Sequence, residues 1–555
     1  MPTAVWYESD GYRPQGRPLM GRRVAGEGFL AAYARYGRTD RFTALVRTRE
    51  GSDEFTETIK ALRPEVPATT LPLMRMGEIA DIGCLYFPGP ITPELAWLRR
   101  FFAPRTWSLC GITHTISSLR VMKTIAAWPT APLEPWDAIV CTSNAVKTAV
   151  QRILDARAAQ LRQQIGATRF PAPRLPIIPL GVDCDKQATI MHDRPPVRAA
   201  LGIADDDFVV LFVGRLTFNA KANPFPMYLA LERVAERHKV VLVECGWSDN
   251  DAIASAFNEA RAKICPSVRS IVLDGREPTQ LARAWACADC FCSLSDNIQE
   301  TFGLTPIEAM ASSLPCLVTD WNGYRDTVRD GIDGFAVPTL APPSGFAADL
   351  VFSHALDIQP YGAYIGQAAA MTVVDCEATT AAFARLAADP DLRRRLGANG
   401  AQRAREAFDW SVVIRAYEAL WDELAEVRTA ALRERPLQAR PVRWPDHLDP
   451  FDLFAGYATA VVGSKSRVRL TPAAETEAFE ERLSLKIAIR ERVPALSGLK
   501  QLRDRLREGS QDLETFLHPY RPADRTRALR GLMLMAKLGL VVIEPVPKSN
   551  EDEHG

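Results

Sequence analysis

The sequence predicts an α/β protein with two consecutive parallel-sheet units, a linker and a mostly helical appendage. Between residues 4 and 425, short apolar runs alternate with segments of helical periodicity, which is typical of parallel sheets with crossover helices. The polar segment Cys184–Asp207, which contains Pro195 and Pro196, interrupts this alternation. A second interruption carries prolines at 436, 441, 445 and 450.

The first unit is expected to contain five strands, each an apolar run bounded by turn-forming residues. These strands are Ala4–Tyr7, Phe42–Val46, Ile82–Phe87, Trp107–Ile112 and Ala138–Cys141. We also expect a glycine-bearing loop and then a helix after the first strand, and a further helix start after the last strand. These segments are Gly21–Gly28, Phe29–Tyr36 and Ser143-Asn144.

The second unit repeats the pattern with six expected strands. They are Phe208–Val213, Val240–Glu244, Ser270–Leu273, Cys290–Leu294, Pro315–Thr319 and Gly334–Val337. The helices expected between or after them are Tyr228–Arg237, Thr279–Cys287, Pro306–Ala311 and a long tract, Thr379–Ala425, that closes this unit.

Domain boundaries follow from these units. We expect two Rossmann-like domains at residues 1–186 and 187–430, a linker at 431–450 and an appendage at 451–555. Within the appendage, a helix at Arg525–Leu538 should end at Gly539 and precede a strand at Leu540–Ile543. The tail 549–555 is expected to be disordered.

Composition narrows the functional class. Lys plus Arg number 67 and Asp plus Glu number 67, so no global charge attracts nucleic acid or an anionic membrane. The 11 cysteines show no disulfide spacing, which indicates free thiols in a reducing compartment. No secretory signal pattern opens the sequence. We therefore expect a cytoplasmic protein with no nucleic-acid partner; peripheral contact with the inner face of a membrane is left open.

The most informative stretch is SDNIQETFGLTPIEAM, residues 295–310. Its loop carries Glu300, Gly303 allows close approach of backbone, and a helix is expected near Pro306. Amides at a helix start bind phosphate, and carboxylates such as Glu308 accept hydrogen bonds from sugar hydroxyls. The pattern predicts a site for a phosphate flanked by two hydroxyl-rich groups, as in a nucleotide sugar.

Simpler interpretations exist for the same residues. Thr305 and Glu308 also match a capping box, in which Glu308 caps its own helix. Arg215 and Lys221 follow an expected strand, where exposed basic residues are common. His114 follows another strand and is compatible with a half-buried structural histidine.

ETFGLTPIEAMA, residues 300–311, resembles the two-glutamate motif of retaining GT-B glycosyltransferases, especially glycosyltransferase family 4. Three further segments resemble that family in the correct order. PLGVD (179–183) resembles its hinge, FVGRL (212–216) followed by Lys221 its phosphate clamp, and DWNGYRDTVRDGIDGFAV (320–337) the segment after the next strand. The resemblance covers residues 105 to 425 well and the first hundred residues weakly.

The resemblance implies a GT-B fold, in which an acceptor domain and a nucleotide-sugar donor domain face a cleft. It implies donor-diphosphate binding by Arg215 and Lys221 and by the amides of Gly303, Leu304 and Thr305. Glu308 would hold the ribose, and Glu300 and His114 would face the transferred sugar. Gly26 and Gly28 would belong to a glycine-rich loop, Met20–Gly28, near donor and acceptor. The implied catalytic set is His114, Arg215, Lys221 and Glu300.

The implied reaction is metal-independent transfer with retention, in which the leaving phosphate helps to deprotonate the acceptor. The nucleoside diphosphate sugar is the co-substrate, with no other cofactor. The acceptor would be a glycan, a lipid-linked sugar or a small molecule, as in polysaccharide biosynthesis. Alternatives are a sugar-nucleotide epimerase or phosphorylase of the same fold, or a non-catalytic scaffold protein. The appendage could mediate homo-oligomerisation.

Two other clusters favour structural roles. Asp249-Asn-Asp251 is expected to be a polar turn rather than a metal motif. Cys287, Cys290 and Cys292 span a helix end and a buried strand, and no second cluster completes a four-ligand metal site. Asn297, Gln299 and Arg276 are candidates for lining the donor pocket, although one sequence does not assign them.

Overall fold

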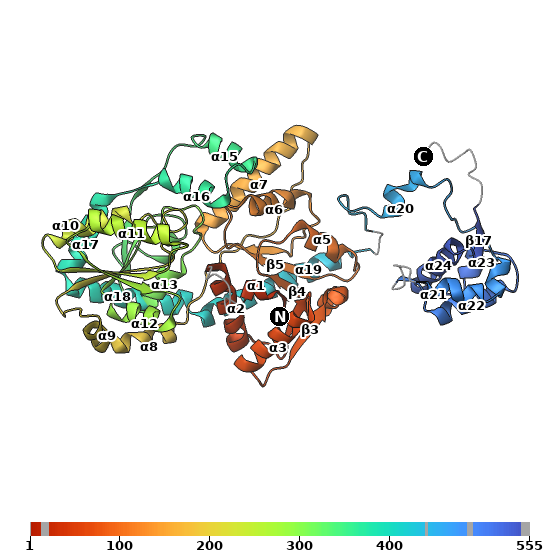
Figure 1. Ribbon diagram of the computed structural model, residues 1–555, viewed down its shortest axis with the longest axis horizontal. Coiled ribbons are helices and arrows are strands. Elements are labelled where there is room, and N and C mark those ends of the chain that lie inside the picture. Colours follow the sequence, from red (N-terminus) through yellow and green to blue (C-terminus); the bar gives the residue numbers. More distant parts are fainter. Residues whose placement is uncertain (1, 13–20, 439–441, 486–491, 546–555) are drawn as a thin grey trace. The chain divides into compact units, whose positions relative to one another are not determined.

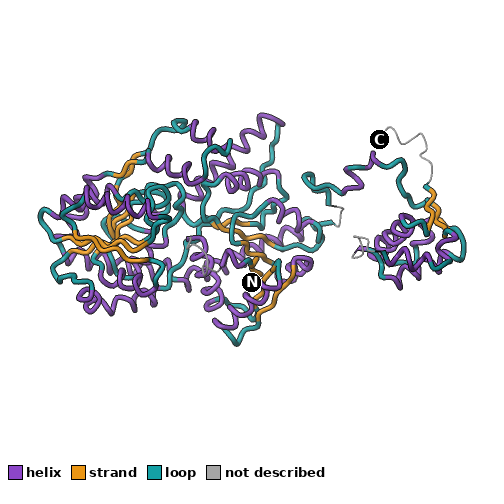
Figure 2. The backbone as a smooth tube through the Cα atoms, in the orientation of Figure 1, coloured by secondary structure: helices purple, strands orange, loops and turns teal. Residues whose placement is uncertain are grey.

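The computed structural model describes residues 2–12, 21–438, 442–485 and 492–545. The chain forms two compact units, residues 1–442 and 443–555. The first is coloured red to cyan in Figure 1 and the second blue, and Figure 2 shows their helices and strands. The predicted tail at 549–555 lies outside the described residues.

The first domain contains a six-stranded parallel sheet in the order β3-β2-β1-β4-β5-β6. Its strands are β1 (Ala4–Tyr7), β2 (Phe42–Val46), β3 (Ala68–Pro72), β4 (Cys84–Phe87), β5 (Ser108–Ile112) and β6 (Ala138–Val140). On one face lie α2 (Gly21–Tyr36), α3 (Arg49–Leu62) and α19 (Trp410–Glu434). On the other lie α5 (Pro93–Arg100), α6 (Leu119–Ala127) and α7 (Asn144–Ile165).

A second parallel sheet has the order β12-β11-β10-β7-β8-β9. Its strands are β7 (Phe208–Val213), β8 (Val240–Gly246), β9 (Arg269–Asp274), β10 (Cys290–Ser293), β11 (Cys316–Thr319) and β12 (Gly334–Val337). Counted from its own first strand, each sheet runs 3-2-1-4-5-6, the Rossmann order. The predicted pair of Rossmann-like domains is therefore confirmed; β3 is a strand that sequence reasoning missed.

Alternation along β7 sends its side chains into two different cores. Val210 packs with one helical layer, and Val209 packs with the other. The first layer comprises α10 (Phe225–Ala235), α11 (Asp251–Ile264), α17 (Cys376–Ala388) and α18 (Pro390–Arg403). The second includes α8 (Cys184–Ile190), α9 (Arg194–Ala200), α12 (Pro278–Cys287) and α13 (Leu304–Ala311). Cys290 and Cys292 lie in the first core and Cys287 in the second, so the three thiols do not converge.

The expected loop at Gly21–Gly28 is wrong, because helix α2 begins at Gly21. Met20 lies outside the described residues. Gly26 and Gly28 serve helix packing rather than loop flexibility. A Cβ at Gly26 would lie 2.0 Å from the backbone oxygen of Gly11, and one at Gly28 would lie 2.8 Å from the Trp410 ring.

The helical tract expected to close the second domain returns to the first. After α18 and a π-helical turn at Ala404–Phe408, helix α19 packs in the core of the first sheet. The crossing lies beside the predicted hinge: Val182 donates to the Phe408 carbonyl (2.8 Å), and the Trp410 amide donates to the Val182 carbonyl (3.1 Å). The second domain therefore ends near residue 409 rather than at residue 430.

A helical hairpin is inserted after β12. Short antiparallel strands, β13 (Thr339–Leu340) and β14 (Val373–Val374), close its base. Helices α15 (Ala348–Ala355) and α16 (Tyr361–Ala370) form its arms, coloured green-cyan beside α7 in Figure 1. The rings of His354 and Tyr364 stack between the arms, with centroids 4.4 Å apart.

The second unit contains more sheet than the single strand expected there. Strands β15 (Arg467–Leu470), β16 (Gln511–Asp512) and β17 (Val541–Glu544) form an antiparallel sheet in the order β16-β15-β17. Its helices are α20 (Pro450–Leu453), α21 (Ala478–Ser484), α22 (Leu496–Leu506), α23 (Leu513–Leu517) and α24 (Pro522–Lys537). The predicted end of α24 at Gly539 is confirmed by the positive φ of that residue, 67°. Across the described chain, no helix combines the length and apolarity needed to cross a bilayer.

We expect Gly26→Ala to lower the free energy of unfolding by about 1–3 kcal/mol, because the new methyl group meets fixed backbone. Gly362→Ala in α16, where nothing lies within 4 Å of the added Cβ, is the matched control. The control should gain about 0.5–1 kcal/mol from helix propensity. Denaturant titration of both variants tests this; equal midpoints would show that the tight packing of α2 is unimportant.

Candidate functional site

The loop after β10 contacts the first domain through Thr301. Its hydroxyl donates to the His114 carbonyl (2.5 Å), and its own carbonyl accepts from the Ser143 hydroxyl (2.7 Å). Asn144 adds hydrogen bonds of 2.5 and 3.1 Å to the Asp326 carboxylate. His114 follows β5, and Ser143 follows β6 and caps α7. The carboxyl ends of both sheets therefore meet at this junction.

Glu300 and Lys221 form an ion pair beside this junction. The Lys221 Nζ lies 3.2 Å from Glu300 Oε2, while Glu300 Oε1 accepts from the amide of Thr301 at 3.1 Å. Burial alone would raise the pKa of Glu300, but the charge of Lys221 and the hydrogen bonds outweigh it, so the net pKa lies below the ordinary value. Two residues that the sequence singled out separately are thus in direct contact.

Consecutive side chains after β10 hold the Lys221 loop in place. The Ser295 hydroxyl lies 3.5 Å from the Lys221 carbonyl, and the Asn297 amide group donates to the Asn219 carbonyl. Between them, buried Asp296 accepts from the backbone of Asn223, and burial raises its pKa to about 7. Asn297 is only 1% exposed. It supports the loop, so the expected pocket-lining role for Asn297 is replaced by a structural one.

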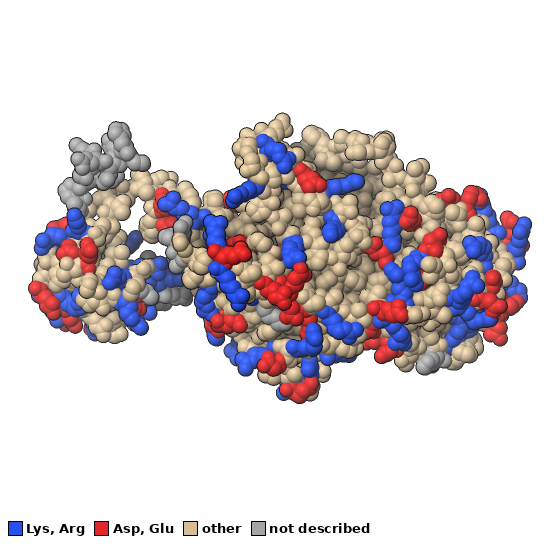
Figure 3. Space-filling view, turned by 180° about the vertical axis from the view of Figure 1, so that it is seen from behind, with Lys and Arg blue, Asp and Glu red and all other residues tan. Residues whose placement is uncertain are grey.

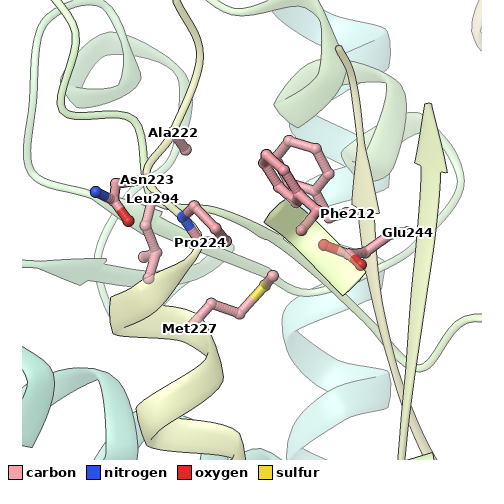
Figure 4. Close-up of a pocket in the computed structure, with 8 residues that line it drawn as sticks. Phe212, Ala222, Asn223, Pro224, Met227, Glu244 and Leu294 are labelled. Carbon is pink, nitrogen blue, oxygen red and sulfur yellow. The ribbon is translucent and has the colours of Figure 1, made fainter. Parts of the chain in front are cut away.

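The residues directly after Lys221 lie over a small cavity lined mostly by apolar side chains. Ala222–Pro224 cover a small cavity of about 10 Å³, with Met227 and Leu294 at its wall (Figure 4). The carboxylate of Glu244 at the same cavity accepts a hydrogen bond from Tyr228 (2.6 Å). A cavity of this size holds one water at most. The cavity is too small for a nucleotide.

Helix α13 begins without a side-chain cap. Gly303 is its first flanking residue, with φ 89°, and a Cβ there would lie 2.2 Å from the ring of Tyr324. Since Thr305 does not cap the helix, the capping-box interpretation of Thr305 and Glu308 is wrong. In the part of the chain that the structure describes, no side chain caps the amides at Gly303, Leu304 and Thr305, which leaves them suited to an anionic group.

Glu308 contrasts with Glu300. Burial raises the pKa of Glu308 to about 7, and the charges of Lys186 and Lys221 only partly oppose this. Among the described residues, no donor forms a hydrogen bond with its carboxylate. A half-buried acid without hydrogen bonds is unfavourable for folding, and such groups are frequent where a ligand supplies the missing donors.

Arg215 follows β7 at the same edge of the sheet. Its guanidinium lies 3.5 Å from the carboxylate of Asp249, a partner that sequence reasoning missed. No ion pair joins Arg215 to Glu300 within the described part of the chain. The neighbouring Asn250 accepts from the amide of Ile253 and caps α11, so the predicted polar turn is confirmed.

His114 and Gly26 line one small internal cavity with Leu180 and Trp410. The structure therefore brings together two residues that sequence reasoning placed near the acceptor. Gly28 packs on the same tryptophan.

Glu308→Gln should flatten the pH dependence of stability. Because the folded pKa, about 7, exceeds the ordinary value of 4.5, the folded state binds more protons between these values and wild-type stability falls as pH rises. The variant should gain about 3 kcal/mol over wild type at pH 8 and nothing at pH 4. Urea titration across this range checks it; a constant difference at all pH values would show that Glu308 titrates normally.

Residues 193–348 match the family model "Glycosyl transferases group 1". D-inositol 3-phosphate glycosyltransferase of Nocardia farcinica is 29% identical over 253 residues, covering 44% of this chain and 53% of the relative. The Mycobacterium bovis protein of the same name is 28% identical over 319 residues, covering 57% and 62%. The chain thus spans little more than half the length of these relatives.

A glycosyltransferase from Rickettsia africae superposes with a TM-score of 0.50 at 14% identity, covering 76% of this chain and 98% of the other. This likeness concerns the fold alone, and it agrees with the two six-stranded parallel sheets described above. Residues 193–348 are therefore similar to the glycosyl transferases group 1 family, and the two six-stranded parallel sheets form a GT-B fold.

Proposed function

We propose that this protein is a retaining glycosyltransferase that moves a sugar from a nucleoside diphosphate sugar to a hydroxyl of an acceptor. The observation that carries the proposal is the contact between Lys221 and Glu300 at the start of α13. A cation, a set of helix-start amides and two carboxylates in different states suit the diphosphate, the sugar and the ribose of one donor.

Each residue has a separate role in this proposal. Lys221 and Arg215 neutralise the diphosphate as its charge develops. Arg215 either leaves its ion pair with Asp249 or keeps this pair while it contacts the phosphate. The amides of Gly303, Leu304 and Thr305 bind phosphate oxygens. Glu308 accepts hydrogen bonds from the ribose hydroxyls, and Glu300 orients the transferred sugar.

The proposed step needs neither a covalent carboxylate intermediate nor a metal ion. The bond from the anomeric carbon to the phosphate oxygen breaks, and the bond from the same carbon to the acceptor oxygen forms on the same face. The acceptor proton passes to the leaving phosphate, so charge and atoms balance. Glu300 is held by Lys221 and two backbone amides, an arrangement that favours an orienting anion over a nucleophile.

The acceptor is proposed to bind against the first domain, near His114. The names of the two D-inositol 3-phosphate glycosyltransferases point to a polyol phosphate as one class of acceptor to test, and glycans and lipid-linked sugars are others. A peripheral membrane location and a homo-oligomer remain proposals of the same kind, and truncation near Arg443 with measurement of molecular mass tests the second.

Thermal unfolding with UDP, GDP, ADP and their sugars tests donor binding. A ligand at about 100 times its Kd adds about 2.7 kcal/mol to the folded state. We expect at least one nucleotide to raise the Tm, and Lys221→Met and Glu308→Gln to weaken that shift. The exposed Lys263, paired with Glu259 on α11, gives the control variant Lys263→Met, which should respond like wild type.

Glu300→Gln should separate binding from turnover. Because Glu300 is proposed to contact the sugar rather than the nucleotide, the variant should retain affinity for the free nucleoside diphosphate and lose about 100-fold or more in the rate of nucleotide release with acceptor. Assay of released nucleotide measures this. If no nucleotide binds wild type, the non-catalytic scaffold interpretation gains support.

A further inference from the structure

Helix α16 of the inserted hairpin reaches the first domain at the domain junction. The hydroxyl of Tyr361, its first residue, lies 2.7 Å from the Ser117 hydroxyl and 3.5 Å from that of Thr115. Ser117 is 8% exposed and lies three residues after His114. The hairpin is therefore attached to the same loop that meets Thr301, although none of the sequence motifs includes it.

The same helix also touches the loop that carries Lys221. A Cβ added to Gly366 would lie 2.8 Å from Cγ and 2.9 Å from Cβ of Asn219, so the helix backbone rests closely on this asparagine. Asn219 is two residues before Lys221, and its carbonyl accepts from Asn297. The helix thus packs on one side of the loop, and the segment after β10 holds the other.

We propose that α16 is a positioning element that couples the junction between the domains to the lysine that binds the donor diphosphate. The hydrogen bond between Tyr361 and Ser117 fixes the helix to the first domain. The packing of Gly366 on Asn219 then makes the position of Lys221 depend on the position of the helix. This inference rests on the proposed function for its consequence in binding.

Two geometric features support this coupling. Tyr361 and Gly366 lie within six consecutive residues of one helix, so displacement of Tyr361 moves Gly366 with it. Ile365 and Ala369 of α16 are only 1% and 2% exposed, so this face of the helix is closely packed. A rigid element with fixed contacts at both ends is the physical basis that coupling between two sites requires.

Amide hydrogen exchange of residues 217–223 in the free protein tests the structural half of the proposal. Tyr361→Phe removes only the hydroxyl, and exchange in this loop should become about threefold faster or more. Tyr364→Phe is the control, since the hydroxyl of Tyr364 makes no hydrogen bond among the described residues and its ring stacks on His354. Equal exchange in Tyr361→Phe and wild type would overturn the coupling.

Titration of Gly366→Ala with UDP, GDP and ADP tests the functional half. Its methyl group should displace Asn219 and weaken binding of whichever nucleotide binds wild type by about three- to tenfold, without loss of Tm, because alanine favours helix. Gly362→Ala on the same helix should bind normally, since its added Cβ meets nothing. Unchanged affinity in Gly366→Ala would refute the link to Lys221. If wild type binds none of the three nucleotides, the proposed function fails, and the exchange measurement still decides the coupling.

Discussion

The candidate site depends on the contact between Thr301 and the first domain, in which Thr301 both donates and accepts a hydrogen bond. Its hydroxyl and its carbonyl are both used there, one with His114 and one with Ser143. Parallel strands bring their carboxyl ends to one edge of a sheet, and the loops that meet here leave this edge in both sheets. Glu300 directly precedes Thr301, and its position is therefore set by the junction as well as by its own domain.

The two glutamates of the site show how environment separates chemically identical groups. Glu300 has a cationic partner and backbone donors, whereas the half-buried carboxylate of Glu308 has no hydrogen-bond donor among the described residues. The ionised carboxylate of Glu300 is stabilised and can orient a neighbouring group. The ionised carboxylate of Glu308 is unfavourable until a ligand supplies hydroxyl donors. A buried carboxylate normally needs hydrogen-bond partners. Glu300 meets this requirement and Glu308 does not, and exceptions of this kind concentrate where proteins bind ligands.

The first domain is completed by helix α19, which lies near the C-terminal end of the first compact unit. Close packing around Trp410 at the start of this helix explains this arrangement. Gly28 and Gly181 both allow backbone to approach this ring, and their added Cβ atoms would lie 2.8 and 2.3 Å from it. Helix α19 therefore belongs to the first core, although it follows the second domain in sequence. The chain passes between the two domains twice, once at the hinge and once where it returns to the first domain. These two segments lie side by side, because Val182 pairs with Asp409.

The sequence by itself determined most strands of the two parallel sheets and the order of the motifs. The apolar run Phe208–Val213 coincides with β7 because local periodicity reports which side chains are buried. Only the tertiary structure decided the partners: Lys221 pairs with Glu300 across 79 residues, and in the helical segment Gly21–Gly28, Gly26 packs on the backbone of Gly11 and Gly28 on the ring of Trp410. Periodicity states that a residue is buried and carries no information about what it is buried against. For that reason the direction of α19 and the contacts of α16 became visible only in three dimensions.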